Sequence, residues 1–159
     1  MAKRNIIKIG DPKLTSKSKK VEKFDNRLHE LLDDMAETMY HANGVGLAAP
    51  QVGLLQRVIV VDVGDGLYEM INPEIIASEG EEAGAEGCLS IPGKLGLVVR
   101  PEKVTVTAQD RNGDFIELTA EGFAARAFCH EIDHLNGILY VDIMERELQP
   151  EELESEENE

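Results

Sequence analysis

Two segments with helical periodicity enclose a long block of strand-like sequence, and this order limits the folds that the chain can adopt. In residues 26–42, apolar side chains recur at the spacing of one helix face: Leu28, Leu31, Leu32, Met35 and Met39. Asp25 is a suitable N-cap for this helix, and Gly44 follows its end. Residues 121–135 return to a helical pattern, which an Asn-Gly pair ends. Because the strands lie mainly between the two helices rather than alternating with them, the sequence predicts an α+β fold.

The block between the helices contains two predicted strand pairs. Residues 57–63 form a β-branched run that predicts a buried strand, and a Gly-Asp-Gly turn leads to a partner strand at residues 67–71. Residues 98–108 alternate loosely between apolar and polar side chains, and residues 115–118 follow an Asn-Gly turn. We therefore predict that these last two segments form a hairpin.

The length and composition are those of one globular domain. The chain has 159 residues, of which 42% are hydrophobic, and it contains no internal repeat and no linker rich in Pro, Gly or Ser. We expect one domain over residues 1–147, followed by an acidic, disordered tail over residues 148–159. No apolar run approaches the length of a membrane span, and the apolar stretch near the N-terminus is too short for a signal peptide. The protein is therefore expected to be cytoplasmic, with no membrane partner.

The net charge of −15 is unevenly distributed along the chain. Residues 1–23 contain eight Lys or Arg against two acidic residues, whereas residues 145–159 contain eight Glu against one Arg. Phosphate backbones would repel the acidic end. The chain also lacks Trp and any Cys-x-x-Cys pair, so it has neither a zinc-ribbon pattern nor the aromatic platforms of a nucleic-acid reader. Direct DNA binding is therefore not expected.

The segment HEIDH at residues 130–134 carries the most chemical information. Residues four apart share one face of a helix, so His130 and His134 can bind the same metal ion. A metal ion lowers the pKa of a bound water molecule, and Glu131 is close enough to exchange a proton with that water. Because so short a pattern also occurs by chance, the alternative is two surface histidines on a polar helix face.

A third protein ligand has to come from elsewhere in the chain. In the metallopeptidase pattern HExxHxxGxxH a third histidine follows at a fixed distance, but here Tyr140 occupies that position. Cys129 directly precedes His130 and so points about 100° away on the helix, which favours an inert core thiol. Cys88 is the stronger candidate, because the Gly and Pro residues around it (GCLSIPG) indicate a shaped bend. Its alternative role is that of a small core residue.

A glycine-rich segment, residues 44–49 (GVGLAA), matches the loose dinucleotide-binding pattern, but it follows a helix and leads to a strand, which is the wrong order. A better interpretation is a backbone that another group approaches closely, with Gly46 leaving the room. Gln51 follows, and beside a metal its amide could form one half of an oxyanion hole, with a backbone N–H near Cys88 as the other half. An ordinary turn with Gln51 on the surface is the alternative.

A charge pair is also expected near Cys88. Arg100 follows a predicted strand and could pair with Glu86, which would fix the loop that presents the cysteine. Two solvated charges are the alternative.

Three segments together resemble the signature motifs of the peptide deformylase family: residues 44–51 (GVGLAAPQ), residues 86–90 (EGCLS) and residues 130–134 (HEIDH). Their order and spacing also match, and residues 6–12 (IIKIGDP) look like the family's first strand. The resemblance covers residues 6–143, and three motifs in register are far more specific than any one of them. It implies mostly antiparallel β-sheets packed around a central C-terminal helix that carries the HExxH motif.

The resemblance implies a metal site and a general acid/base. Cys88, His130 and His134 would bind the metal ion, and Glu131 would be the catalytic acid and base. The family generally uses Fe²⁺, while Zn²⁺, Ni²⁺ or Co²⁺ can occupy the same site. The ligand types alone favour zinc, so the expectation of iron rests on the resemblance.

The implied reaction is hydrolysis of the N-formyl group from the N-terminal methionine of nascent polypeptides, with release of formate. Gln51 and the main-chain N–H of Leu89 would hold the formyl oxygen as it becomes an oxyanion. Gly46 would pair with the substrate backbone, and Val45 would line the pocket for the methionine side chain.

The implied partners are N-formylmethionyl peptides and, transiently, nascent chains at the ribosome, with the enzyme a monomer. Some family members end in a long basic helix, whereas this chain ends in a short acidic segment, which argues against a ribosome contact through that end. Two other functions remain open at this stage. One is a metallopeptidase that cleaves internal peptide bonds, and the other is a catalytically silent, metal-binding module.

Overall fold

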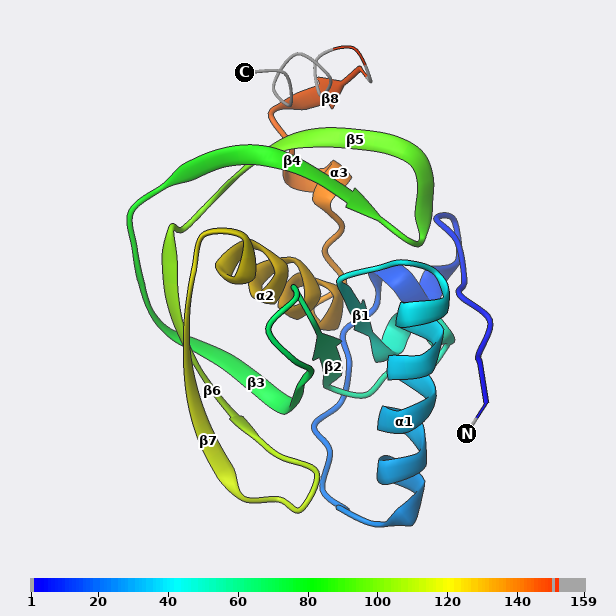
Figure 1. The fold of residues 1–159 in the computed structure, drawn as a ribbon. Helices are drawn as coiled ribbons and strands as arrows, with labels where there is room; N and C mark the ends of the chain where they lie inside the picture. Colours follow the sequence, from blue (N-terminus) through cyan, green and yellow to red (C-terminus); the bar gives the residue numbers. More distant parts are fainter. Residues whose placement is uncertain (1, 150, 152–159) are drawn as a thin grey trace.

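Two β-sheets and two long helices form the part of the chain that the structure, a computed structural model, describes: residues 2–149 and residue 151 (Figure 1). The elements in chain order are η1 (Pro12–Thr15), α1 (Asn26–His41), β1 (Gly46–Ala48), η2 (Ala49–Val52), β2 (Val58–Val61), β3 (Tyr68–Glu79), β4 (Glu82–Cys88), β5 (Ile91–Arg100), β6 (Lys103–Gln109), β7 (Phe115–Glu121), α2 (Gly122–Leu135), α3 (Tyr140–Ile143) and β8 (Arg146–Leu148). The predicted α+β class is confirmed. Among the described residues, no helix is both long and apolar enough to cross a bilayer.

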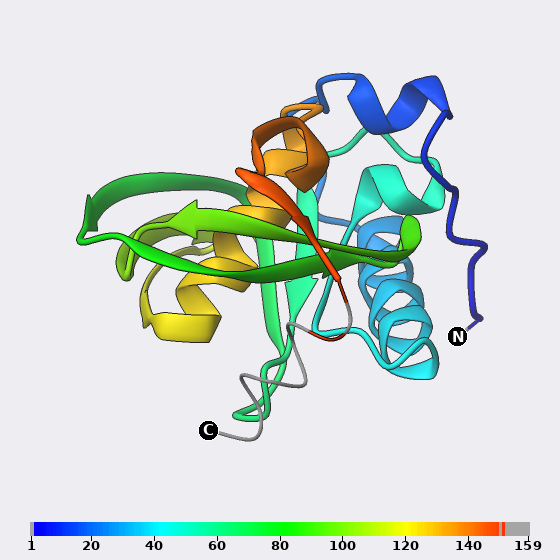
Figure 2. The same cartoon turned by 90° about the horizontal axis from the view of Figure 1, so that it is seen from above.

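Within the described residues, the strands form a five-stranded sheet in the order β1-β2-β3-β6-β7 and a three-stranded sheet in the order β4-β5-β8. Neighbouring strands run antiparallel in both sheets. In Figure 1, β4 and β5 arch over α2, and Figure 2 shows β8 running beside β5 in the same sheet. The central helix that carries the HExxH motif therefore lies between antiparallel sheets, as the resemblance implied.

α2 has two different faces. Its apolar side chains, among them Phe128, Cys129 and Ile132, pack with Val104 and Val106 in the core of the five-stranded sheet. Its opposite face carries polar side chains that bond to β4 and β5. The helix is thus fixed by apolar packing on one side and by polar contacts on the other.

α1 begins at its predicted cap, because the Asp25 side chain accepts a hydrogen bond from the Leu28 N–H at 3.2 Å. The predicted apolar stripe is buried and packs against β1 and β2. The hairpin predicted for residues 57–71 is also confirmed, since β2 pairs with β3. These elements hold the glycine-rich segment between α1 and α2.

The single strand predicted for residues 98–108 is wrong. The chain leaves β5 at Arg100 and enters β6 at Lys103, and these strands belong to different sheets. Val98 pairs with Gly84 in the three-stranded sheet. Pro101 has no N–H to donate and therefore cannot continue the ladder, so the strand ends there. The predicted hairpin is confirmed for β6 alone, which pairs with β7.

The strand expected at residues 6–12 is absent from the described chain. Ile7 N–H donates to Gln51 O at 2.8 Å, and Ile9 N–H donates to Ser90 O at 2.9 Å. Gln51 and Ser90 belong to two separate segments rather than to one strand, so no ladder can form. The chain then enters η1, where the Asp11 side chain caps the first turn.

The C-terminal part of the description ends in β8. Leu148 is buried and pairs with Leu95 of β5. The tail was expected over residues 148–159, and of these, residue 150 and residues 152–159 lie outside the described residues.

Candidate metal centre and its cavity

α2 holds both histidines of the HEIDH segment on one buried face. Its first turns are rich in Ala, the best helix former, and it ends at Asn136, followed by Gly137 in a left-handed conformation at φ 76°. His130 and His134 are 8% and 1% exposed, and their ring centroids lie 5.0 Å apart. The alternative of two surface histidines is therefore wrong.

Cys88 joins the histidines from the end of β4, after a register shift between Glu86 and Cys88. Its Sγ lies 3.3 Å from His134 Nε2. One ligand atom each from Cys88, His130 and His134 can be chosen so that all three lie within 4.8 Å of one another. Two atoms that each bind one ion at about 2.0–2.3 Å are separated by at most about 4.6 Å, so these donors have nearly the spacing that a shared ion requires.

The donor set fits a divalent transition metal. One thiolate and two imidazoles are ligands typical of such ions. His130 Nδ1 is occupied by a hydrogen bond with Glu86 Oε1 at 2.8 Å, which leaves its Nε2 for a cation. Cys129, by contrast, lies in the core, and burial raises the pKa of its thiol to about 11. Among the described residues, one group of three or more His, Cys, Asp or Glu side chains is close enough together to hold a metal ion. It consists of Cys88, His130 and His134.

Glu86 is the centre of a buried ionic network beside the candidate metal ligands. Arg100 donates from Nε and Nη2 to its two oxygens, both at 2.8 Å, and Arg126 Nη1 donates to Oε2 at 2.8 Å. Arg100 also donates to Asp133 Oδ2 at 2.6 Å. Burial opposes ionisation of Glu86, but hydrogen bonds with Arg100 and His130 outweigh it and lower its pKa to about 2. The predicted Glu86–Arg100 pair is confirmed, and it is buried rather than solvated.

Glu131 is a second buried carboxylate in the same place. It is 4% exposed, and its Oε1 has no hydrogen-bond partner among the described residues. Burial raises the pKa of its carboxyl group to about 7, so the group can take up and release a proton near neutral pH. A Cβ at Gly46 would lie 2.9 Å from Glu131 Cδ, which is closer than real Cβ contacts. Glu131 is therefore the group that approaches the glycine.

Gln51 lies in the site rather than on the surface, where the alternative would have placed it. It is 1% exposed, and its Oε1 accepts a hydrogen bond from the Ala48 N–H at 2.9 Å. Its Nε2 lies 3.1 Å from Ser90 Oγ and 3.5 Å from Cys88 Sγ. A fixed amide donor beside a cation site can stabilise an oxygen that gains negative charge.

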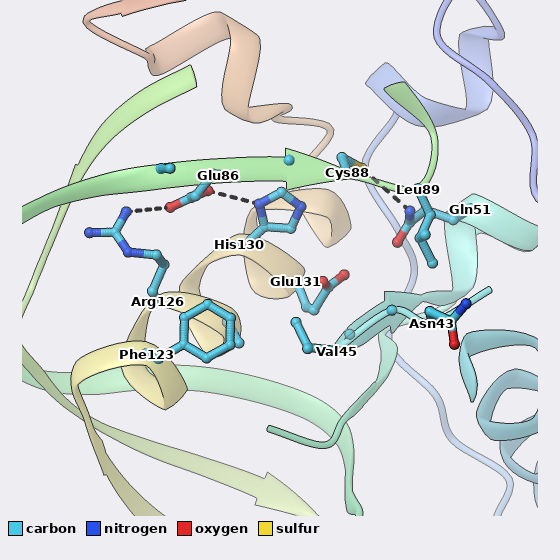
Figure 3. Close-up of a pocket in the computed structure, with 15 residues that line it drawn as sticks. Asn43, Val45, Gln51, Glu86, Cys88, Leu89, Phe123, Arg126, His130 and Glu131 are labelled. Carbon is cyan, nitrogen blue, oxygen red and sulfur yellow. Dashed lines mark hydrogen bonds and ion pairs between the residues drawn. The ribbon is translucent and has the colours of Figure 1, made fainter. Parts of the chain in front are cut away.

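A cavity of about 370 Å³ opens beside these side chains (Figure 3). The predicted site residues that line it are Val45, Gly46, Gln51, Cys88, Leu89, His130 and Glu131. His134 reaches the same site through its contact with Cys88. Three chain segments that are far apart in sequence thus supply one cavity.

Phe123 and Arg126 also line the cavity, but they were not predicted as site residues from the sequence. Phe123 is 56% exposed at the first turn of α2, and Figure 3 shows Arg126 directed toward Glu86. They precede His130 by seven and four residues, so all three share one helix face. Helical spacing could have found them, but their residue types gave no hint of metal chemistry.

Known proteins resemble this chain over nearly its whole length. The family described as polypeptide deformylase matches residues 3–149. A peptide deformylase of Caldicellulosiruptor bescii is 58% identical over 154 residues, which cover 97% of this chain and 93% of that protein. A peptide deformylase of Caldanaerobacter subterraneus subsp. tengcongensis is 57% identical over 154 residues and covers 97% of each chain.

Solved structures share the fold as well. The crystal structure of peptide deformylase from Thermotoga maritima matches with a TM-score of 0.88 and 46% identity, covering 89% of this chain and 97% of that chain. The structure of a peptide deformylase from Synechococcus elongatus, in complex with actinonin, gives a TM-score of 0.87 and 42% identity over 96% of this chain and 82% of that chain. This chain belongs to the polypeptide deformylase family.

Proposed function

We propose that this protein is a metal-dependent peptide deformylase, which removes the N-formyl group from the N-terminal methionine of nascent polypeptides and releases formate. One observation carries the proposal: the donors of Cys88, His130 and His134 converge beside the buried carboxylate of Glu131. Family membership supports the reaction, since the relatives described above are peptide deformylases.

A divalent cation held by Cys88, His130 and His134 would polarise the formyl carbonyl and lower the pKa of a water molecule. We expect Fe²⁺ as the native ion because the family generally uses it, with Zn²⁺, Ni²⁺ or Co²⁺ able to replace it at the same thiolate and imidazole donors. Glu86 fixes the tautomer and the ring orientation of His130 through its Nδ1.

Glu131 moves the proton in this proposal. Its carboxylate takes a proton from the attacking water and later delivers it to the departing α-amine, as the bond between the formyl carbon and the nitrogen breaks. The raised pKa and the unpartnered Oε1 of Glu131 suit both steps. Gln51 Nε2 and the Leu89 N–H would donate to the formyl oxygen while it carries negative charge.

The substrate backbone is proposed to bind along β1. In the described residues β1 is the edge of its sheet, so an extended peptide can add there and pair with Gly46. Val45 is 39% exposed at the cavity, where it would contact the methionine side chain. A Cβ at Gly44 would lie 2.7 Å from Leu89 Cδ1, and Gly46 lies against Glu131. We expect these close walls to exclude the methyl group of an acetylated substrate.

The metallopeptidase alternative shares the HExxH core but lacks its third histidine. Tyr140 stands at that position, buried, with its ring stacked on His130 at 6.0 Å between centroids. Cys88 completes the ligand set instead. A catalytically silent module would retain the ligands, but it would have no need of a buried, unpartnered Glu131 beside them.

The proposed partners are N-formylmethionyl peptides and, transiently, nascent chains at the ribosome in the cytoplasm. We expect the protein to act as a monomer, because all the proposed site residues come from one chain.

Formate release from formyl-Met-Ala tests the function directly. Protein is purified without oxygen, its metal content is measured, and acetyl-Met-Ala and casein serve as control substrates. Release from the formyl peptide alone, in proportion to bound metal, is the expected result. No release from fully metallated protein would refute the proposal, and casein cleavage in the same sample would favour the metallopeptidase.

Glu131→Ala tests the proton-transfer role within that assay. The variant should retain its metal, because Glu131 is not among the proposed ligands, and its kcat should fall at least ~10²-fold. Glu117→Ala, which changes an exposed carboxylate on β7, is the matched control and should retain full activity. Near-normal turnover of Glu131→Ala would remove Glu131 from the mechanism.

A further inference from the structure

Ser90 is a fully buried hydroxyl that the proposed mechanism does not use. It lies in the turn between β4 and β5, two residues after Cys88, and is 0% exposed. Its Oγ accepts a hydrogen bond from Gln51 Nε2 at 3.1 Å. Burial of a hydroxyl is costly unless it is hydrogen-bonded, so the bond to Gln51 is the contact that justifies a serine here.

Hydrogen bonds hold the Gln51 amide at both its oxygen and its nitrogen. The Ala48 N–H holds Oε1 at 2.9 Å, which allows the carboxamide only one orientation. That orientation turns Nε2 toward Ser90 Oγ and Cys88 Sγ, the latter at 3.5 Å. A carboxamide nitrogen carries two hydrogens, so one can remain on Ser90 while the other points toward the cation site.

The main chains of the same two residues are joined by residues 6–9, which we call the N-terminal strap. Ile7 N–H donates to Gln51 O at 2.8 Å, and Ile9 N–H donates to Ser90 O at 2.9 Å. The two donors are separated by one residue, so the strap sets the spacing between η2 and the β4–β5 turn. Leu89, whose N–H is the second proposed oxyanion donor, lies in that turn.

We propose that Ser90 is a positioning residue whose hydroxyl, together with the N-terminal strap, holds the Gln51 amide where it can stabilise the oxyanion. The inference rests on the proposed role of Gln51. Ser90 binds neither substrate nor metal in this scheme, so its loss acts on kcat and leaves KM and metal content unchanged. A misplacement of about 1 Å can cost ~10²-fold in rate, and because the Ala48 bond remains, we expect Ser90→Ala to lower kcat about tenfold.

A double-mutant cycle separates positioning from a general structural role. Gln51→Ala removes one oxyanion donor and should lower kcat by ~10²–10³-fold. Ser90→Ala should then have no further effect in the Gln51→Ala background, because no amide remains to be positioned. A purely structural role for Ser90 predicts that the two factors multiply.

Two control variants complete the experiment, with kcat, KM, bound metal and Tm measured for every protein. Ser90→Thr keeps the hydroxyl and should keep a kcat close to that of the wild type. Thr38→Val removes another buried hydroxyl, which donates to Asp34 O and accepts from the Arg4 N–H, and should lower Tm without changing kcat. If Ser90→Ala does not fold, Ser90→Cys takes its place, because it keeps the buried volume and replaces the hydroxyl with a thiol, whose sulfur is only a weak hydrogen-bond acceptor.

The outcomes distinguish the inference from the function on which it rests. A full-rate Ser90→Ala protein or multiplying factors in the cycle would each overturn the positioning role. A full-rate Gln51→Ala protein would refute the oxyanion role of Gln51 and the positioning role together. Wild-type formate release would still support the deformylase function in all of these cases.

Discussion

Glu86 accepts hydrogen bonds from Arg100, Arg126 and His130, so replacing one of its carboxylate oxygens with nitrogen disturbs the whole buried ionic network. Its Oε1 accepts from Arg100 Nη2 and His130 Nδ1, and its Oε2 accepts from Arg100 Nε and Arg126 Nη1, each at 2.8 Å. In Glu86→Gln an NH₂ group replaces one of the two oxygens. Whichever way the amide turns, the NH₂ group faces two former donors, and at least one of them is a guanidinium N–H.

The expected loss of stability follows from those contacts. A hydrogen bond to a charged group contributes about 1.5–3 kcal/mol, and neutralising one partner of a buried ion pair typically costs about 3–5 kcal/mol. Arg100 would retain Asp133, and Arg126 would retain main-chain carbonyl acceptors, so we place the loss within about 3–5 kcal/mol. For a chain of this size, each kcal/mol shifts Tm by about 2–4 °C, which gives a decrease of roughly 6–20 °C.

Urea and thermal unfolding of the metal-free protein measure this loss without interference from bound metal. A competition titration then measures metal affinity, which should weaken by about 10–100-fold because a neutral amide replaces the carboxylate partner of His130. Glu79→Gln is the matched control: Glu79 is 70% exposed in side-chain area and lies 3.5 Å from Lys103 Nζ, so its change should cost less than about 1 kcal/mol. A Glu86→Gln protein as stable as that control, with unchanged metal affinity, would refute the reasoning.

Three further changes test separate parts of the molecule. Gly46→Ala pushes a methyl group against the Glu131 carboxylate, so kcat for formate release should fall about 10²-fold while bound metal, measured by atomic emission, stays constant. Cys88→Ser should sharply reduce bound metal, whereas Cys129→Ala should keep it in full, because Cys129 is a core thiol; equal metal loss in both would contradict the assignment. Asp34→Asn should destabilise the protein at pH 7, with a difference that shrinks below pH ~4 in urea unfolding. Burial raises the pKa of Asp34, but hydrogen bonds from Ala2 and Arg4 lower it by more, so the pKa lies below its ordinary value. The ionised carboxylate therefore stabilises the fold at pH values above the ordinary pKa, and this contribution is lost in acid. A pH-independent difference would count against this explanation.

The helices and their chemistry could be predicted from the sequence because the signals are local. Asp25, the apolar stripe of α1 and the Asn-Gly pair after α2 each act within a few residues of the element that they define. The i and i+4 spacing of His130 and His134 likewise needs no knowledge of the rest of the fold. These are the features for which sequence and structure agree in detail.

The errors arose where a segment's partner lies far away in the chain. Residues 6–12 resemble the family's first strand, but the N–H groups of Ile7 and Ile9 donate to Gln51 and Ser90, more than 40 positions further on. Residues 98–108 show one loose alternation, yet Pro101 divides them between two sheets. Pro101 is a local signal for the break between the two strands. No local pattern, however, assigns these strands to different sheets or distinguishes a strand from the strap.

The position of the network explains why the three-stranded sheet is needed over α2. The face of α2 that it covers carries Arg126 and His130, which are 5% and 8% exposed, and burial of such groups is unfavourable unless each charge is paired. β4 contributes Glu86 and β5 contributes Arg100, so the strands that exclude water from the helix also supply the charges that make this burial tolerable. The same water exclusion strengthens every electrostatic interaction at the cation site. A chain with the HEIDH helix but without this sheet would therefore lose both the third proposed ligand, Cys88, and Glu86, the carboxylate that bonds to His130 Nδ1.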